Sequence, residues 1–217
     1  MSILSLQNIC FAYDKTPVLQ NISYEFEKGK MYCIIGKSGA GKTTLLSLLS
    51  GLAKPTSGEI FYEDKNVAKI DKYTFRSKYI GVVFQSFNLI TKYTALENVM
   101  LSMDVANYKI KNKKARALEL LQSVGLDEEE ANRRVLKLSG GQQQRVVIAR
   151  ALSYNPDIIL ADEPTGNLDI DTQNEIMNIF RELSNQGKCV ILVSHSTDVA
   201  AMCDERYQLV KPGRNKK

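Results

Sequence analysis

One stretch of the chain has the composition of a loop that holds phosphate groups. Residues 36–43 read Gly-Lys-Ser-Gly-Ala-Gly-Lys-Thr, which matches the pattern G-x-x-x-x-G-K-[ST] without deviation. Glycines let backbone N–H groups turn inward around phosphate oxygens, and the helix that follows points its positive end at the same anions. Lys42 can reach the β- and γ-phosphates, and the Thr43 hydroxyl can bind Mg²⁺. We therefore expect ATP and Mg²⁺ here, on Gly36, Lys37, Ser38, Gly39, Ala40, Gly41, Lys42, Thr43 and Thr44.

Two acids end an apolar stretch in the second half of the chain. Residues 158–161 are Ile-Ile-Leu-Ala, and Asp162 and Glu163 follow them directly. Neighbouring side chains of a strand point in opposite directions, and loops at the carboxyl ends of strands line ligand sites in α/β proteins. We expect Asp162 to hold Mg²⁺, directly or through water, and Glu163 to orient and polarise the attacking water. An apolar stretch that ends in Asp-Glu is common and is weak evidence by itself. It becomes strong evidence for a nucleotide site because the same chain has a phosphate loop.

The apolar pattern of the sequence predicts the strands and helices that would position these groups. An apolar run from Met31 to Gly36 predicts a buried strand before the phosphate loop, and leucines between Thr43 and Gly51 predict a helix after it. That context argues against the alternative, a glycine-rich turn with a surface lysine. Other predicted elements are strands at residues 59–62, 80–84, 157–161 and 189–194, a helix at 172–184, and two or three short strands within 3–30 around a turn at 14–17.

The middle of the chain has a different pattern. From about Phe87 to Tyr154 the residues favour helices and almost no strands, and Lys113 to Val124 carry one apolar stripe. Strands and helices therefore alternate at both ends of the chain, and a helical insert interrupts them. This order predicts an α/β fold with a mostly parallel sheet and a helical lobe.

Composition places the chain among ordinary globular proteins. It has 217 residues, a hydrophobic content of 44% and a formal net charge of +5. No apolar run approaches the ~20 residues that cross a bilayer, and residues 1–5 lack a basic region and a cleavage site. We therefore expect a cytoplasmic protein without a signal peptide or transmembrane segment, whose membrane part, if any, is another chain.

The cysteines and the basic residues indicate no further chemistry. None of the four cysteines has zinc spacing or forms a CxxC pair, and we expect Cys33 and Cys189, which lie in apolar runs, to be buried free thiols. Basic residues cluster weakly at 109–114 and 211–217, where solvated surface is the first interpretation and a lipid-facing role the second. A net charge of +5 offers little to nucleic acid, so no nucleic-acid partner is expected.

A segment before the acidic pair resembles a known family. Residues 137–145, Lys-Leu-Ser-Gly-Gly-Gln-Gln-Gln-Arg, look like the signature of the ATP-binding-cassette (ABC) ATPases, which few other families carry. The resemblance implies a P-loop NTPase core with a mostly parallel sheet, a small antiparallel β subdomain at the N-terminus and an inserted helical subdomain. It implies one nucleotide-binding domain over residues 1–217, with a core lobe at about 1–86 and 156–217 and a helical lobe at about 87–155.

The resemblance also implies that two copies of the chain enclose ATP. The phosphate loop of one copy would face Ser139, Gly140, Gly141 and Gln142 of the other, which gives two composite sites. The residue types agree, because Ser139 is a good N-cap and two glycines expose backbone N–H groups at the start of a helix. The alternative is a Ser-Gly-Gly helix cap that binds nothing. A symmetric homodimer is the expected assembly.

Further residues take their roles from the same resemblance. Tyr13 matches the aromatic residue that stacks on adenine, although Phe11 is close and either ring could belong to the core. Gln85 matches the glutamine that contacts Mg²⁺ and senses the membrane partner. Asp169 matches a residue that touches the opposite subunit, and His195 matches the histidine that contacts the γ-phosphate. The implied catalytic residues are Lys42, Gln85, Glu163 and His195, and the implied magnesium ligands are Thr43, Gln85 and Asp162.

Three segments narrow the resemblance to one group. Residues 80–89, 95–99 and 161–169 look like those of the macrolide-exporter and lipoprotein-release group, which includes antimicrobial-peptide resistance transporters and the cell-division cassette. The chain departs from the group at Ser196, where Asp is usual, and at residues 133–137, which lack a common proline. The resemblance implies an ATPase subunit at the cytoplasmic face of the cell membrane that drives a separate transmembrane permease subunit.

Other functions are compatible with part of this pattern. A cell-division-type ATPase that controls a wall-remodelling enzyme without transport would keep every ATP residue, so only its partner separates it. A nucleic-acid ATPase of the same superfamily usually has a coiled-coil insertion, a zinc motif or a second cassette, which this sequence lacks. A kinase would leave residues 139–145 unexplained.

An apolar stretch after Gln85 could contact a partner. Some of its residues must belong to the core of the helical lobe, and an exposed subset would suit a groove that receives a helix from the membrane partner. The stretch comprises Phe87, Leu89, Ile90, Tyr93, Leu96 and Val99.

Overall fold

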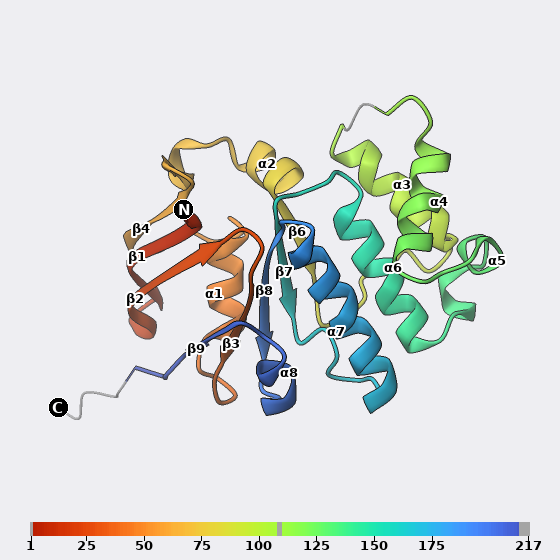
Figure 1. Ribbon diagram of the computed structural model, residues 1–217. Helices are drawn as coiled ribbons and strands as arrows, with labels where there is room; N and C mark the ends of the chain where they lie inside the picture. Colours follow the sequence, from red (N-terminus) through yellow and green to blue (C-terminus); the bar gives the residue numbers. More distant parts are fainter. Residues whose placement is uncertain (1, 108–109, 213–217) are drawn as a thin grey trace.

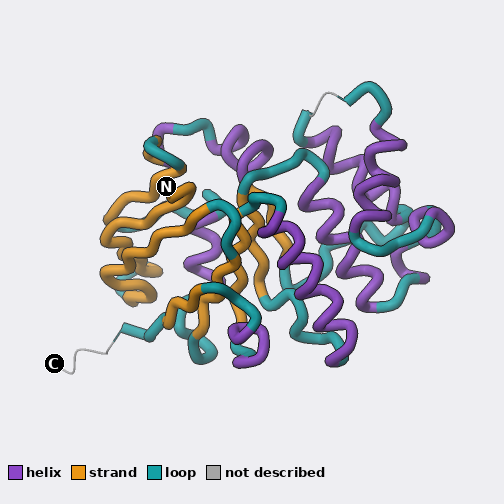
Figure 2. The backbone as a smooth tube through the Cα atoms, in the orientation of Figure 1, coloured by secondary structure: helices purple, strands orange, loops and turns teal. Residues whose placement is uncertain are grey.

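Two β-sheets and the helices around them make up the fold, drawn as a ribbon in Figure 1 and as a backbone tube in Figure 2. The computed structural model describes residues 2–107 and 110–212. The strands are β1 (Ser2–Tyr13), β2 (Thr16–Glu27), β3 (Met31–Ile35), β4 (Ser57–Tyr62), β5 (Lys65–Asn66), β6 (Ile80–Val83), β7 (Ile158–Asp162), β8 (Cys189–Ser194) and β9 (Glu205–Gln208). The helices are α1 (Lys42–Leu49), α2 (Lys72–Thr74), α3 (Ala95–Val105), α4 (Lys113–Ser123), α5 (Glu128–Ala131), α6 (Gly140–Leu152), α7 (Ile170–Asn185) and α8 (Thr197–Ala201), with the short turns η1 (Val67–Lys69), η2 (Phe75–Tyr79) and η3 (Val135–Lys137).

The larger sheet is parallel and lies at the centre of the molecule. Its strand order is β6-β7-β8-β3-β9, and every neighbouring pair is parallel. Tyr32 and Ile34 pack with the leucines of α1, whereas Met31 and Cys33 pack with α7, so helices cover both faces, as Figure 1 shows. This double cover explains the apolar runs that make up β7 and β8 up to their polar last residues, Asp162 and Ser194. Cys33 and Cys189 are buried free thiols, as predicted.

The register of the parallel strands brings the chemistry to one edge of the sheet. Ile35 pairs with Ser194, and Val193 pairs with Asp162. The carboxyl ends of β3, β8 and β7 therefore lie side by side. The phosphate loop follows β3, His195 follows β8, and the acidic pair is formed by the last residue of β7 and the residue after it, so the fold places these groups together.

The smaller sheet is antiparallel, with strand order β2-β1-β4-β5. The prediction of two or three short strands within residues 3–30 is confirmed in number and in its turn, since β1 and β2 flank residues 14–15, but it was wrong in length, since each strand has 12 residues. Register shifts interrupt their pairing, for example between Leu6 and Ile9, and Asn8 and Asn21 have positive φ. These irregularities break the alternation of apolar and polar residues, so the sequence pattern resembled shorter strands.

The helices α3–α6 all come from the chain between β6 and β7, as the helical pattern of that stretch predicted. Thr94, Asp127 and Ser139 begin α3, α5 and α6 with capping boxes. One hydrophobic cluster joins these helices to α7 and to one face of the parallel sheet. The P-loop fold with a parallel sheet, an N-terminal antiparallel sheet and inserted helices is confirmed. The division into lobes at residues 87 and 155 stays a prediction.

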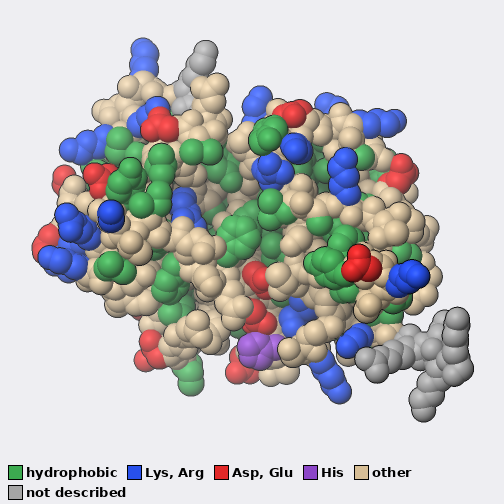
Figure 3. Space-filling model, turned by 180° about the vertical axis from the view of Figure 1, so that it is seen from behind, with side chains coloured by type: hydrophobic (Ala, Val, Ile, Leu, Met, Phe, Trp, Pro, Cys, Tyr) green, Lys and Arg blue, Asp and Glu red, His purple; other side chains and the backbone are tan. Residues whose placement is uncertain are grey.

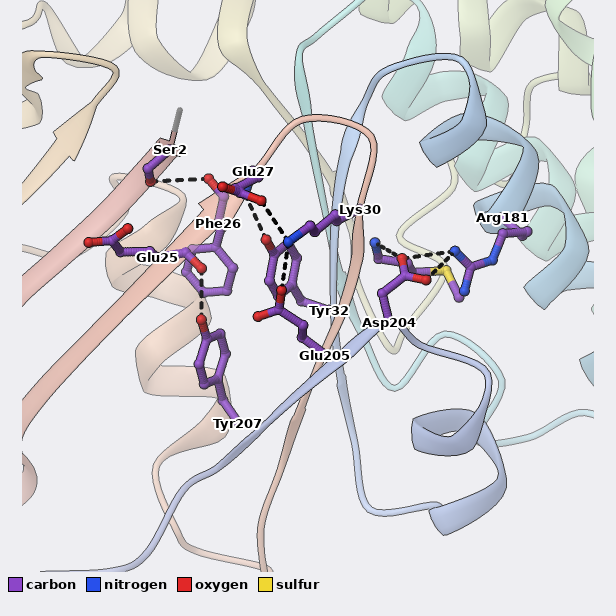
Figure 4. A network of polar contacts seen from close by, with 11 residues as sticks. Ser2, Glu25, Phe26, Glu27, Lys30, Tyr32, Arg181, Asp204, Glu205 and Tyr207 are labelled. Atoms are coloured by element: carbon purple, nitrogen blue, oxygen red, sulfur yellow. Dashed lines mark hydrogen bonds and ion pairs between the residues drawn. The ribbon is translucent and has the colours of Figure 1, made fainter.

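A polar network ties the start of β3 to β9 and α7 (Figure 4). The Lys30 ammonium lies 2.8 Å from the Glu205 carboxylate of β9. Asp204 accepts a hydrogen bond of 2.7 Å from the backbone N–H of Met31 and pairs with Arg181 of α7 at 2.8 Å. These contacts hold β9, an edge strand whose alternation of half-buried and exposed residues gave no apolar run for sequence analysis to detect.

Charged side chains are spread over the surface. Figure 3 shows Lys and Arg interspersed with Asp and Glu over one face of the molecule. Of the two weak basic clusters, residue 109 and residues 213–217 lie outside the described residues, while Lys111, Lys114 and Lys211 are exposed. No helix within the described part of the chain has the length and apolar character that a membrane-spanning segment needs.

Candidate functional site

The phosphate loop runs from the end of β3 to the start of α1. Gly41 precedes α1 with a φ of +96°, a left-handed conformation that glycine adopts without strain. A Cβ at Gly36 would lie 2.7 Å from the carbonyl oxygen of Leu209, so a side chain does not fit there. Because Gly41 has no side chain to cap the first turn of α1, an anion can satisfy the N–H groups at this positively polarised end.

A cleft of about 590 Å³ opens beside the loop. Lys42 bends back over the loop, and its ammonium donates a hydrogen bond of 2.8 Å to the carbonyl oxygen of Gly36. Val18 of β2 also lines the cleft and was not predicted, because its place depends on how the two sheets pack. The residues that line the cleft are Val18, Ser38, Gly39, Gly41, Lys42, Thr43, Gln85, Asp162, Glu163 and His195. The predicted residues that share the loop or helix start without lining the cleft are Gly36, Lys37, Ala40 and Thr44.

Thr43 and Asp162 meet at the floor of this cleft. The Thr43 hydroxyl donates a hydrogen bond of 3.0 Å to Oδ2 of Asp162, the last residue of β7. Burial raises the pKa of the Asp162 carboxyl, and the nearby Glu163 raises it further, while Thr43 and Lys42 act in the opposite direction. A positive partner stabilises the charged form of a buried carboxyl. Thr43 and Asp162 together can therefore bind a hard cation such as Mg²⁺.

Glu163 is held on both of its carboxylate oxygens. Its backbone has a φ of +45°, which is strained for a residue with a side chain, and its N–H donates to the carbonyl oxygen of Val193 at 2.9 Å. Oε1 lies 2.8 Å from Nδ1 of His195, and the Ser194 hydroxyl donates to Oε2 at 3.1 Å. The Glu163 side chain is 11% exposed and that of His195 is 71% exposed. The acid is thus fixed, whereas the histidine faces the open cleft.

Ser194 is a residue that sequence reasoning missed. It is the last residue of β8 and is buried, although every other residue of that strand is apolar. A hydroxyl at the end of a buried apolar strand was the available signal. Its contact with Glu163 could not be inferred, because the two residues are brought together only by the pairing of β7 with β8.

Comparison with known families decides the identity of this site. A family model described as ABC transporter matches residues 19–166, which include the phosphate loop, residues 137–145 and the acidic pair. The chain belongs to the ABC transporter family. Within that family it is an ATP-binding subunit and an ATPase.

Relatives of this ABC subunit cover nearly its whole length. A Bacillus subtilis protein, YclH, described as an uncharacterized ABC transporter ATP-binding protein, is 47% identical over 96% of this chain and 94% of its own. A Thermotoga maritima protein with the same description is 44% identical over 96% of this chain and 91% of its own.

Solved structures agree with the fold. The dimeric structure of MJ0796, a bacterial ABC transporter cassette, is 39% identical, covers 95% of this chain and 94% of its own, and superposes with a TM-score of 0.86. A second structure of MJ0796 is a dimer in a post-hydrolysis state, bound to ADP and phosphate, and is 38% identical with the same TM-score.

The signature segment of this ABC subunit does not line the cleft of its own chain. Ser139 and Gly140 are exposed at the start of α6. The Ser139 hydroxyl accepts from the backbone N–H of Gln142 at 3.2 Å, and the Gln142 carboxamide accepts from the N–H of Ser139 at 2.8 Å. Gln142 also donates to Glu130 at 2.5 Å. Its side chain is therefore engaged within the helix cap, and Ser139, Gly140 and Gly141 present the helix start outward.

Tyr13 and Asp169 likewise lie outside the cleft. Tyr13 is exposed near the end of β1, and its ring packs edge to face against Phe11 at 4.9 Å. Phe11 is the ring that packs against the core. Asp169 caps α7, accepting from the N–H of Thr172 at 2.9 Å and from its hydroxyl at 2.7 Å, which lowers the pKa of its carboxyl.

Proposed function

We propose that this ABC subunit hydrolyses ATP between two copies of itself and drives a separate membrane-spanning partner. The observation that carries the proposal is the split of the predicted site within one chain. The phosphate loop and the acids share one cleft, while the Ser139 helix start, which also suits an anion, faces away from it. A second copy would bring that helix start to the open side of the cleft, and the related MJ0796 cassette is dimeric.

The loop and the first acid bind and orient the nucleotide in this proposal. Lys42 and the N–H groups of α1 meet the phosphates, and Tyr13 stacks on the adenine. Thr43 and Asp162, which touch at 3.0 Å, supply oxygen ligands that fit Mg²⁺, and Gln85 lines the same cleft. When bound, Mg²⁺ would neutralise charge on the reacting phosphates.

Glu163 and His195 act on the attacking water and the γ-phosphate. Phosphoryl transfer depends on positioning and on stabilising charge more than on covalent help. Glu163 accepts a proton from the water, while His195, exposed and 2.8 Å from Glu163, turns to the γ-phosphate. Asp169 lies at the contact between copies. Loss of the γ-phosphate weakens that contact, which makes the dimer a ligand-controlled switch.

A groove between the helices and the parallel sheet suits the membrane partner. It has a volume of about 390 Å³. Among the residues that line it are Phe84, directly after β6, Arg150 of α6, and Tyr154, which follows α6. Arg150 donates to the carbonyl oxygens of Phe87 and Asn88, which fixes the segment after Gln85 to α6. Movement at the ATP cleft can therefore reach the groove through one short connection.

The apolar stretch after Gln85 has buried and exposed members, as expected if part of it contacts a partner. Leu96 and Val99 are buried in the core, whereas Ile90 and Tyr93 are exposed. We propose that the partner is a permease of the macrolide or antimicrobial-peptide efflux or lipoprotein-release type, at the cytoplasmic face of the membrane. A cell-division partner would use the same groove, so the partner's identity separates the two.

The test is affinity purification of the tagged chain from detergent-solubilised membranes of its host, with the co-purifying proteins identified. A variant with Leu52→Ser is the control for specific capture, because Leu52 lines the groove and its side chain is exposed. Recovery of a membrane protein by the wild type and not by the variant supports the proposal. Recovery of soluble partners or nucleic acid alone would contradict the membrane partner and leave the ATPase assignment intact.

A further inference from the structure

The Ser194 hydroxyl has two hydrogen-bond partners in the buried space behind the acidic pair. Its residue is 2% exposed. The hydroxyl oxygen accepts from the backbone N–H of Ser196 at 3.1 Å, and the hydroxyl donates to Oε2 of Glu163 at 3.1 Å. No other side chain of β8 is polar.

The backbone fixes the direction of the hydroxyl proton. A serine hydroxyl has a single proton to donate and lone pairs that accept. The N–H of Ser196 can only donate, so the hydroxyl must accept from it and is left to direct its own proton to Glu163. A hydrogen bond to an ionised carboxylate is shorter and stronger than one between neutral groups. Ser194 is therefore a dedicated donor to Glu163.

The two side chains that contact the Glu163 carboxylate differ in their freedom to move. His195, on Oε1, is 71% exposed and is free to rotate into the cleft. Ser194, on Oε2, is buried within a strand that pairs directly with β7. The backbone of Glu163 is tied to the same strand through the carbonyl oxygen of Val193 at 2.9 Å. When His195 turns away, Ser194 stays.

We propose that Ser194 is a positioning residue for hydrolysis. Its hydroxyl holds Oε2 of Glu163, so that Oε1 faces the attacking water once His195 has turned to the γ-phosphate. This inference rests on the proposed role of Glu163 as the base. It predicts that Ser194 affects turnover and leaves ATP binding unchanged, because the hydroxyl does not line the cleft.

The test compares four variants by kcat and by the Kd of ATP. Ser194→Ala removes the hydroxyl. Ser194→Thr and Ser194→Val have nearly the same shape, so they separate the hydroxyl from packing in case the alanine variant folds poorly. Ser184→Ala is the matched control, since Ser184 is buried in α7 and its hydroxyl donates to the carbonyl oxygen of Arg181 at 2.8 Å.

We expect kcat to fall about 10- to 100-fold in Ser194→Ala and Ser194→Val, the range for losing a hydrogen bond to a charged group. Ser194→Thr restores most of the rate, Ser184→Ala keeps it, and the Kd of ATP is the same in all four. The inference would be overturned if Ser194→Val had the same kcat as Ser194→Thr. It would also be overturned if the variants weakened ATP binding, seen in Kd, and left kcat unchanged.

Variants that carry Glu163→Gln distinguish a failure of this inference from a failure of the proposed function. In Glu163→Gln, adding Ser194→Ala should reduce the residual rate no further, because Ser194 acts through Glu163. If Glu163→Gln itself turned over at the wild-type rate, the role of Glu163 as the base would fail. If Glu163→Gln were inactive and Ser194→Ala fully active, only the positioning role of Ser194 would fail.

Discussion

Lys42 is the residue on which ATP affinity should depend most directly. Its ammonium lies 2.8 Å from the carbonyl oxygen of Gly36 and lines the cleft. A hydrogen bond to a charged group contributes about 1.5–3 kcal/mol, so we expect Lys42→Ala to weaken ATP binding about 10- to 100-fold. Titration calorimetry measures this, with Lys65→Ala on β5 as the charge-matched control. Equal losses in both variants would show that net charge, and not this site, sets the affinity.

The types and spacing of residues in the sequence predicted which side chains line the cleft. They did not predict the hydrogen-bond partner of each side chain. Lys42, Asp162 and Glu163 were found because the spacing of glycines and acids is specific to phosphate chemistry. The expected contact of Gln142 with nucleotide stays a prediction, while the contact that the structure shows for its side chain, the helix cap at Ser139, could not be foreseen. The role of a single polar side chain depends on contacts across strands and helices, which spacing along the chain does not contain.

At the scale of elements, α3 depends on its capping box. The Thr94 hydroxyl accepts from the N–H of Glu97 at 3.1 Å, and the Glu97 carboxylate accepts from the N–H of Thr94 at 2.7 Å. Loss of an N-cap typically costs about 1 kcal/mol. We expect Thr94→Ala to lower the free energy of unfolding in urea by about that amount, and Thr94→Ser to keep it. A loss in Thr94→Ser as large as in Thr94→Ala would contradict the capping role.

Buried elements were predicted better than edge elements, for a physical reason. The strands β3, β7 and β8 are covered on both faces, so their sequences are apolar runs, apart from the polar last residue of β7 and of β8. The edge strand β9 is half exposed and depends on the pairing of Tyr32 with Glu205 and on the polar network around Asp204. Its stability comes from neighbours distant in sequence, which an apolar pattern does not show.

At the scale of the whole molecule, Asp204 links the parallel sheet to α7 in a pH-dependent way. Burial raises the pKa of its carboxyl, but Arg181 and the N–H of Met31 outweigh burial, so the pKa in the folded protein is lowered. Folding therefore favours the charged carboxylate. Its contribution to stability is present above the ordinary aspartate pKa, about 3.9, and is lost as pH falls through the lower folded value.

Asp204→Asn tests this linkage. We expect the variant to have a smaller free energy of unfolding than the wild type near neutral pH, and the difference to shrink as pH falls below the ordinary aspartate pKa of about 3.9. Urea unfolding at a series of pH values measures it, with Asp64→Asn as a control carboxylate on the surface. A difference that stays constant over the whole pH range would show that Asp204 contributes through packing and not through its charge.

Two copies of the chain are needed for the proposed chemistry, because the Ser139 helix start and the cleft lie apart in one copy. Glu163→Gln keeps the size of the side chain and removes its ability to take a proton from water. We expect this variant to bind ATP, to lose turnover by about 10²-fold or more, and to stay closed around the nucleotide.

The most direct measurement is therefore the molar mass of Glu163→Gln by light scattering, with and without ATP and Mg²⁺, together with its rate of ATP hydrolysis. We predict a monomer without nucleotide and a stable, nearly inactive dimer with ATP and Mg²⁺. A chain that binds ATP and stays monomeric, or one that hydrolyses ATP at the wild-type rate, would contradict a site shared by two copies in which Glu163 activates the water.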